Sequence, residues 1–302
     1  MFRIAHISDI HLAPLPKPTV FELASKRITG YVNWKINRAA VQRPEYLSAL
    51  VSHMIDQHPD HVSITGDLVN LATNAEIVRA GQWLENLAVK LGGRHMLTAI
   101  AGNHDAYVPG SLKKALNRWA PFVSDSTTPP IANDFPLLHR RENISIISCN
   151  SAEATLPFQA TGYFRTKQAE RLAQILTEEK EQFRIVLIHH LPIENETKKH
   201  KRLIGAEMFC RCIQHSGAEL VLHGHTHLNS LYWMEDHKMK VPVLGISAAG
   251  QIPGGNKPAG RYNLISIDGK QGSWNCHLQQ YGSAEISSTG LVELMNEQQL
   301  HG

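Results

Sequence analysis

The sequence predicts a mixed α/β fold in which two mixed β-sheets face each other and helices cover their outer sides. Two observations support this fold class. Over the first 227 residues, apolar strand-like runs alternate with amphipathic helical stretches, which is typical of parallel β-α-β units. Over the last third, short strand-like runs are separated by turns, which indicates antiparallel pairing. The sequence shows no internal repeat or linker, so we expect one domain over residues 1–302.

Strands are predicted where apolar, often β-branched residues run together. In the first part of the chain such runs cover residues 2–7, 62–65, 96–101, 144–149, 185–188 and 220–222. The last third adds shorter runs over residues 231–234, 241–246, 262–267 and 273–278. The glycine-containing stretch 269–272 predicts a hairpin turn between the last two runs.

Helices are predicted where apolar residues recur every three or four positions. One begins at Pro44, since proline is favoured in the first turn of a helix, and another ends before Gly92. The helical stretches cover residues 44–55, 74–90, 112–119, 165–181 and 203–215. We also expect a short C-terminal helix over residues 291–300.

Composition argues against several classes of function. The net charge of +3 and the isoelectric point near 8.6 are mild, whereas a nucleic-acid-binding surface carries clustered Lys and Arg. No run approaches the ~18 apolar residues of a membrane span, and the first residues lack the pattern of a signal peptide. The four cysteines form neither a zinc pair nor a disulfide framework. We therefore expect a cytoplasmic protein with a small-molecule substrate and no nucleic-acid polymer as partner.

Residues 13–43 form an unusual segment after the first strand. Pro14, Pro16 and Pro18 prevent regular strand pairing, and the rest mixes apolar with basic side chains. One interpretation is a lid that binds an anionic lipid or nucleotide-sugar headgroup at a membrane surface, with Lys26 and Arg27 as substrate contacts. The other is a solvated, partly helical excursion that covers the edge of the sheet.

Five short polar clusters occur in a fixed order, and each follows one of the predicted buried strands. Strands that end at polar side chains deliver them to one edge of a sheet. The clusters are Asp9-x-His11, Gly66-Asp67, Gly102-Asn103-His104-Asp105, His189-His190 and Gly224-His225-x-His227. If these strand ends converge, the clusters form a single site.

The side chains in these clusters are of the types that bind divalent ions in hydrolases, namely carboxylate, amide and imidazole groups. The candidate ligands are Asp9, His11, Asp67, Asn103, His189, His225 and His227. Side chains two positions apart on an extended segment point the same way, so each pair spaced in this manner can share an ion. A central aspartate can bridge two ions ~3.5–4 Å apart, the spacing typical of two-metal phosphoester hydrolysis. The glycines allow tight backbone turns beside the ions.

Each cluster also has a simpler interpretation when it is taken alone. Asp and His end many strands, and Asp67 can serve as a turn residue only. His190 points away from His189 on an extended chain, so it either contacts substrate or simply forms a hydrogen bond. We interpret His6 and His223 as structural. The ordered combination of clusters is what indicates a metal site.

The ordered set of clusters resembles the calcineurin-like metallophosphoesterase superfamily, over residues 9–227. The resemblance implies a four-layer α/β-β/α sandwich that holds two divalent ions, such as Mn, Fe or Zn. It implies one ion on Asp9, His11 and His227, and a second ion on Asn103, His189 and His225, with Asp67 bridging. It further implies that His104 acts beside the phosphate as an acid or transition-state stabiliser, and that Asp105 orients His104.

Departures from neighbouring families indicate the substrate class. Protein phosphatases of the superfamily carry Asp-Arg-Gly after the second cluster, whereas Leu68 and Val69 follow Asp67 here. The related nucleases carry long DNA-binding regions that this chain lacks. Residues 241–248 and 261–264 resemble bacterial cyclic-nucleotide and glycerophosphodiester phosphodiesterases. We therefore predict a phosphodiesterase for a small phosphodiester such as a cyclic nucleotide.

Two alternatives remain open at this point. The mixed apolar and basic segment 13–43 also fits superfamily members that cleave the pyrophosphate of a UDP-diacylglucosamine in lipid A synthesis. A non-catalytic scaffold of the same fold is a function of another class. The presence of every expected ligand and of His104 argues against the scaffold.

Overall fold

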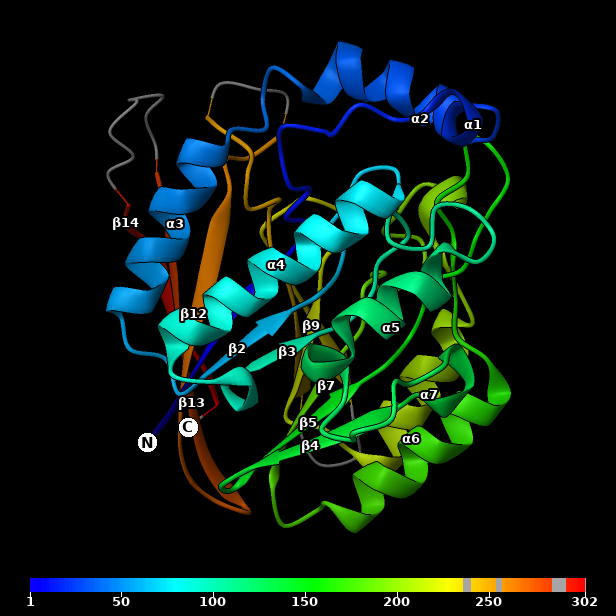
Figure 1. Cartoon of the computed structure of the whole chain (residues 1–302). Helices are drawn as coiled ribbons and strands as arrows, with labels where there is room; N and C mark the ends of the chain where they lie inside the picture. Colours follow the sequence, from blue (N-terminus) through cyan, green and yellow to red (C-terminus); the bar gives the residue numbers. More distant parts are fainter. Residues whose placement is uncertain (236–239, 254–256, 284–291, 302) are drawn as a thin grey trace.

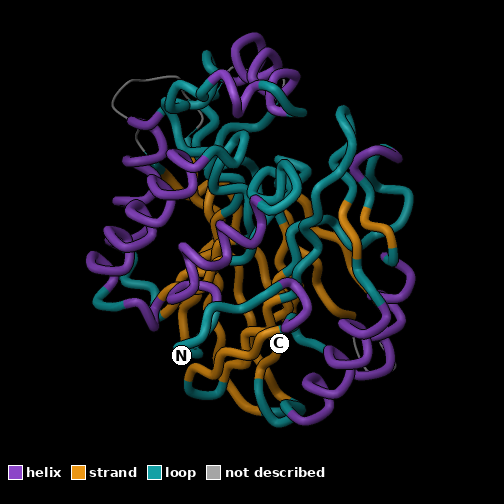
Figure 2. Tube along the Cα trace, turned by 45° about the vertical axis from the view of Figure 1, so that its right-hand side comes forward, coloured by secondary structure: helices purple, strands orange, loops and turns teal. Residues whose placement is uncertain are grey.

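The computed structural model describes residues 1–235, 240–253, 257–283 and 292–301. Two large β-sheets lie face to face in the middle of the molecule, and helices cover both outer sides (Figures 1 and 2). The first sheet has the strand order β14-β13-β12-β1-β2-β3, and the second has the order β10-β11-β9-β7-β5-β4. Both sheets mix parallel and antiparallel pairs, as predicted.

The first sheet is built around the N-terminal strand, which pairs in parallel with β2 and antiparallel with β12. Its strands are β1 (Phe2–Ile7), β2 (His61–Ile64), β3 (Leu97–Ala99), β12 (Arg261–Lys270), β13 (Ser273–Gly282) and β14 (Glu293–His301). The second sheet contains β4 (Leu137–Arg141), β5 (Ile144–Ser148), β7 (Phe183–Leu187), β9 (Leu220–His223), β10 (Ser230–Glu235) and β11 (Lys240–Gly245). The short strands β6 (Gly162–Tyr163) and β8 (Leu203–Ile204) pair separately.

Five longer helices flank the sheets, and their ends follow local sequence rules. Pro44 occupies the first turn of its helix, and Thr73 forms a capping box with Glu76 at the start of another. Gly92 ends that helix in the left-handed conformation that glycine adopts without strain. These helices are α3 (Pro44–Asp56), α4 (Asn74–Leu91), α5 (Ser111–Val123), α6 (Thr166–Glu178) and α7 (Ala206–Ser216). Short 3₁₀ turns occur at Arg94–Met96, Ala132–Asp134 and Lys199–Lys201.

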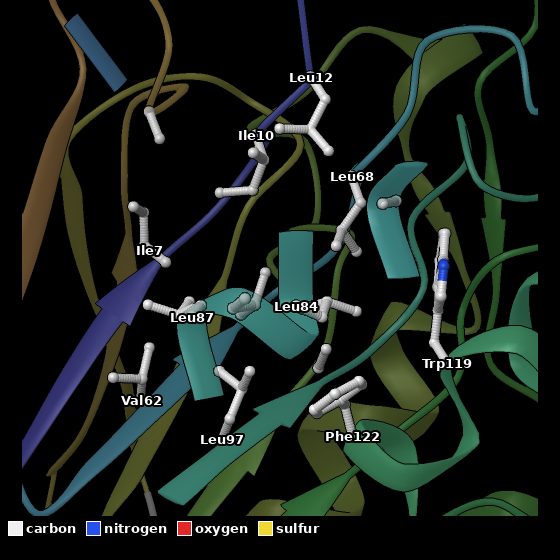
Figure 3. Close-up of a cluster of buried hydrophobic side chains, with 14 of the residues drawn as sticks. Ile7, Ile10, Leu12, Val62, Leu68, Leu84, Leu87, Leu97, Trp119 and Phe122 are labelled. Atoms are coloured by element: carbon white, nitrogen blue, oxygen red, sulfur yellow. The ribbon is translucent and has the colours of Figure 1, made fainter. Parts of the chain in front are cut away.

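Three buried apolar clusters show the layering directly. One fills the space between the sheets and includes Ile4, Ile146 and Leu222. The second packs α3, α4 and α5 against the first sheet, and Figure 3 shows Leu84 and Trp119 within it. The third packs α6 and α7 against the second sheet. The order helix, sheet, sheet, helix is the predicted four-layer sandwich.

The segment 13–43 folds into helices at the top of the molecule in Figure 1. These are α1 (Val20–Leu23), α2 (Arg27–Asn33) and a π-helix, η1 (Trp34–Arg38). The backbone rejoins the main body where Arg43 N donates to Gly250 O at 2.9 Å. The described helices include none that is both long and apolar enough to cross a lipid bilayer.

The prediction of a C-terminal helix over residues 291–300 is wrong, since Glu293–His301 form strand β14. Residue 291 lies outside the described residues. The stretch lacks glycine and proline, so its local preference did not exclude a helix. Pairing with the edge of β13 satisfies its backbone instead, and Leu300 enters the core between the sheets. Likewise, the helix predicted from residue 203 begins at Ala206, because Leu203–Ile204 pair with β6.

Candidate metal centre

The predicted ligands lie at the carboxyl ends of β1, β2, β3, β7 and β9, where neighbouring turns are joined by backbone hydrogen bonds. Asp9 N donates to Gly66 O at 3.0 Å, and His11 N donates to Asp67 O at 2.9 Å. In the second sheet, Gly224 N donates to His189 O at 3.1 Å. The parallel strands therefore bring these polar clusters to one end of the sandwich, as the sequence predicted.

The expectation that Asp9/His11 and His225/His227 lie on extended backbone is wrong. All four residues have φ between 44° and 66°, and Asp67 has φ 56°. Residues other than glycine seldom adopt this left-handed conformation, and it often marks functional sites. The direction of each side chain is therefore set by a tight turn, and not by alternation along a strand.

Four side chains form the first candidate metal site. Asp9 Oδ1 lies 3.0 Å from His227 Nε2 and 3.9 Å from His11 Nε2, and His11 Nε2 lies 3.7 Å from Asp67 Oδ2. The candidate ligand atoms of these four residues all lie within 4.8 Å of one another. A single ion can therefore be surrounded by two carboxylates and two imidazoles.

A second site lies directly beside the first. Asn103 Oδ1 is 2.9 Å from His225 Nδ1 and 3.2 Å from His189 Nε2. His189 Nε2 is in turn 3.5 Å from Asp67 Oδ2, the same oxygen that faces His11. Asp67 thus stands between the two groups, which is the place that a bridging ligand requires.

The orientation of two imidazole rings fits metal ions, because their Nδ1 atoms face backbone carbonyls. His11 Nδ1 contacts Val69 O at 3.0 Å, and His189 Nδ1 contacts Thr65 O at 2.6 Å. Such backbone partners fix the tautomer in which Nε2 carries the lone pair for a metal. Within the described part of the chain, the buried His11 Nε2 has no hydrogen-bond partner. Buried polar atoms are rarely left in this state, and a cation would account for it.

The pKa values of the buried groups also favour the binding of cations at this site. Burial lowers the pKa of His189, but the negative charges of Asp67 and Asp9 outweigh it and raise that pKa to about 9. Burial raises the pKa of Asp9, yet the neighbouring His227 pulls it well below its usual range. The two carboxylates therefore remain ionised and draw positive charge toward themselves, which is the field that divalent ions satisfy.

His104 and Asp105 differ from the sequence-based expectation in one respect. The Asp105 carboxylate accepts backbone N–H groups of Asp67, Val69 and Gly102 and does not contact the His104 ring. His104 Nδ1 instead meets Asn70 O at 2.5 Å. Asp105 therefore shapes the turn that carries Asp67, and the Asn70 carbonyl orients the imidazole. The expected pairing of Asp105 with His104 is wrong.

Of the two basic residues that the sequence predicted as substrate contacts, Lys26 lines the pocket and Arg27 does not. Lys26 lines a pocket of about 800 Å³ over the candidate ligands, together with Asp67, Asn103 and His104. Arg27 lies outside the described lining of this pocket and donates to Leu71 O at 2.9 Å and Ala72 O at 2.7 Å. Arg27 is thus an anchor for the segment.

His190 lies behind the site, beneath the second set of ligands. It is fully buried, its Nδ1 lies 2.8 Å from Ser151 Oγ, and its ring centre is 4.3 Å from that of His225. His190 is absent from the described lining of the pocket. This placement supports the hydrogen-bonding interpretation of His190 rather than a contact with substrate. Its remaining nitrogen, Nε2, lies with His189 and His225 in a group that could hold an ion.

Arg38 is a pocket residue that the sequence analysis placed only among the basic residues of segment 13–43 and not among the substrate contacts. It is the last residue of η1 and lines the pocket, with Nη2 donating to His104 Nε2 at 3.1 Å. One arginine among several basic residues in segment 13–43 gave no sequence signal. Only the folded segment distinguishes Arg38 from its exposed neighbour Lys35.

Comparison with known proteins agrees with this site. Residues 2–229 match the family described as calcineurin-like phosphoesterase. The chain belongs to this family. Its members are generally metal-dependent hydrolytic enzymes, and the Asp and His clusters described above could hold metal ions in a site of that kind. Among curated proteins, none matches this chain.

Several solved structures share the fold at low sequence identity. A dimetal phosphatase from Danio rerio has a TM-score of 0.61 at 12% identity, covering 99% of this chain and 98% of that one. A purple acid phosphatase from yellow lupin (Lupinus luteus) seeds has a TM-score of 0.53 at 12% identity, covering 98% of this chain and 53% of that one. A putative 5'-nucleotidase from Staphylococcus aureus has a TM-score of 0.51 at 14% identity, covering 99% and 54%. At these identities the likeness concerns the fold alone.

Proposed function

We propose that this protein is a dinuclear metal-dependent phosphodiesterase that hydrolyses a small phosphodiester. The observation that carries the proposal is the placement of Asp67 Oδ2, 3.7 Å from His11 Nε2 and 3.5 Å from His189 Nε2. One carboxylate oxygen shared by two sets of candidate ligands is the arrangement that two-metal hydrolysis uses.

Bound divalent ions would supply an activated water and would offset negative charge on the phosphoryl oxygens. The chain's own contribution is positioning. Asp9, His11 and His227 would hold one ion, and Asn103, His189 and His225 would hold the other, with Asp67 between them. His104 lies at the pocket wall beside Asn103, where it can stabilise the transition state or give a proton to the leaving oxygen.

The phosphodiester preference is supported by the resemblance of residues 241–248 and 261–264 and by the pocket. Its volume of about 800 Å³ suits a nucleotide-sized ligand. The first of these segments is followed directly by Ala249, whose N donates to Ser8 O at 3.1 Å. This contact supports the loop that carries Asp9. The resembling segments are absent from the described lining of the pocket, so the class of substrate has to be decided with a panel of substrates.

The decisive experiment measures hydrolysis of bis(p-nitrophenyl) phosphate by metal-stripped protein after addition of Mn²⁺, Fe²⁺ or Zn²⁺. We expect turnover that needs metal and that His11→Ala abolishes. His215→Ala is a matched control because His215 lies at the exposed end of α7. Cyclic nucleotides, glycerophosphodiesters, UDP-diacylglucosamine and phosphomonoesters then rank the substrates. No turnover with any divalent ion would support the non-catalytic scaffold instead.

A second candidate, pyrophosphate hydrolysis at a membrane surface, is favoured by exposed apolar side chains on segment 13–43 and in the pocket lining. Phe21 is 91% exposed and Ile36 72% exposed on the helical segment, and Phe158 is 83% exposed. Phe158 itself lines the pocket. Exposed apolar side chains grouped at one site mark interaction surfaces. A substrate with lipid chains, such as UDP-diacylglucosamine, would explain why these apolar side chains are exposed.

The structure changes how this candidate is tested. Lys26 donates to Thr155 O at 3.0 Å and Arg27 to two backbone carbonyls, so neither is free to contact lipid headgroups. The test is therefore Phe21→Asp with Phe158→Asp, measured as sedimentation with phosphatidylglycerol vesicles. We expect at least tenfold weaker binding, since burying a Phe side chain contributes about 1.5–3 kcal/mol.

Val89→Asp is the matched control, because Val89 is 73% exposed on α4 and lies far along the chain from Phe21 and Phe158. Wild-type protein that does not bind vesicles, or equal loss in the Val89 variant, would contradict the membrane candidate. Hydrolysis of soluble phosphodiesters would be unaffected by that result.

A further inference from the structure

Arg38 brings a positive charge into the pocket from outside the sheets. It ends η1, lines the pocket beside Asp67 and Asn103, and donates from Nη2 to His104 Nε2 at 3.1 Å. Among the described residues, no carboxylate lies within 4.0 Å of its guanidinium. A guanidinium has five N–H donors, so one imidazole leaves most of them without a partner.

Among the described residues, the charges that favour the cationic form of Arg38 most strongly are the carboxylates of the candidate metal site. Burial lowers the pKa of Arg38, whereas the charges of Asp67 and Asp9 raise it. Two bound divalent ions would neutralise these carboxylates. Arg38 would then be a half-buried cation in the pocket without a counter-charge. A partly buried cation without an anion beside it raises the free energy of the folded protein, so binding of an anion next to Arg38 would be favourable.

The segment that carries Arg38 is fixed to the body on both sides of the pocket. Lys26 Nζ donates to Thr155 O at 3.0 Å and to Gln159 O at 3.2 Å, and Arg27 Nε donates to Leu71 O at 2.9 Å. After η1, Gln42 forms an isolated bridge with Gln251. A π-helical turn is uncommon and is often found at functional sites. Here it ends at the one arginine that reaches the pocket from this segment.

We propose that Arg38 binds a non-bridging oxygen of the scissile phosphoryl group, beside His104. The proposal rests on the proposed phosphoesterase function and adds a residue to it. Arg38 would supply the contact that protein phosphatases obtain from the arginine of Asp-Arg-Gly, which is absent after Asp67. When Arg38 turns to the phosphate, His104 Nε2 loses its donor and is released toward the substrate.

This assignment has a consequence for substrate class. A fork of N–H donors matches two oxygens of one phosphoryl group. The two non-bridging oxygens of a phosphodiester match this fork, and a second ionised oxygen, as in a phosphomonoester, would strengthen the contact. The missing arginine after Asp67 is consequently no argument against such substrates.

The first experiment measures the affinity of inorganic phosphate for Mn²⁺-loaded protein by titration calorimetry, in wild type, Arg38→Ala, Arg38→Lys and Lys35→Ala. We expect Arg38→Ala to weaken phosphate at least tenfold, since a charge-assisted hydrogen bond contributes about 1.5–3 kcal/mol. Arg38→Lys should recover only part of this loss, because an ammonium is a point charge. Lys35 is exposed on the same helix, and its replacement should change nothing.

The second experiment measures kcat and KM with p-nitrophenyl phosphate and bis(p-nitrophenyl) phosphate. We expect Arg38→Ala to lower kcat/KM for both substrates, with the larger fall for the monoester, while metal content stays unchanged. If Arg38 only positions His104, turnover would fall but phosphate affinity would not. That outcome would overturn the proposal, as would equal losses in Arg38→Ala and Lys35→Ala.

The two proposals can fail separately. Phosphate binding needs no turnover, so wild-type protein that binds phosphate and hydrolyses nothing would contradict the phosphoesterase function alone. Phosphate affinity within twofold of wild type in Arg38→Ala would contradict the role of Arg38 alone. If Arg38→Ala does not fold, Arg38→Lys gives the same comparison with less disturbance.

Discussion

The metal centre and the helices of segment 13–43 face one pocket, but they are held in place by different means. The ligands Asp9, Asp67 and His189 are buried at strand ends and joined by backbone hydrogen bonds between turns. In contrast, α1, α2 and η1 contain no buried residue and are tethered by side chains such as Lys26. We therefore propose that the sheets fix the reaction chemistry, whereas the segment, which contributes little to the core, selects the substrate.

The largest effect is expected at the residue shared by both sets of ligands. Asp67→Asn keeps the shape of the side chain but removes the charge that lies between His11 and His189. We expect both metal equivalents to be reduced and turnover to fall at least about 10³-fold, because both ions lose their common ligand. Elemental analysis and hydrolysis assays measure this. Retention of both ions would contradict the bridging role of Asp67.

A smaller effect is expected at His104, which stands between the two regions. Its Nδ1 meets Asn70 O and its Nε2 accepts from Arg38. We expect His104→Ala to lower kcat by about 10²–10⁴-fold, the usual contribution of a catalytic acid or base, with metal content unchanged. Equal loss of metal and activity would instead make His104 a ligand. Measuring both kcat and metal content therefore separates a role of His104 in the reaction from a role in metal binding.

The smallest effect is expected where the segment is tethered. Lys26→Ala removes three hydrogen bonds, to Thr155 O, Thr155 Oγ1 and Gln159 O. We expect KM to rise by about three- to tenfold with kcat nearly unchanged, because a looser segment weakens substrate binding but leaves the ligands in place. Faster amide hydrogen exchange over residues 20–38 should accompany it.

Lys17→Ala is the control for the tether, since Lys17 is exposed in the same segment. Lys26→Ala could instead lower kcat as strongly as His104→Ala does. That result would contradict the view that the sheets carry out the reaction while segment 13–43 only selects the substrate. If Lys26→Ala leaves hydrogen exchange unchanged, the tether is not what orders the segment.

Much of the fold was predictable because its signals are local and strong. Apolar runs followed by polar clusters located the strands that carry Asp9, Asp67 and His189, and helix spacing located α3 and α4. Strand β14 was not predictable, because Glu293–His301 is a strand only by pairing with β13. The pairing of Asp105 with the turn around Asp67, rather than with His104, also depends on backbone positions distant in sequence.

The sequence by itself determined the list of candidate ligands and their delivery to one edge, since residue type and the alternation of strand and helix are local properties. Tertiary structure alone decided that Asp67 lies between two sets of ligands, that Arg27 is an anchor, and that Arg38 reaches His104. The physical reason is distance: a hydrogen bond between residues far apart in the chain depends on how whole elements pack. No local pattern records that packing.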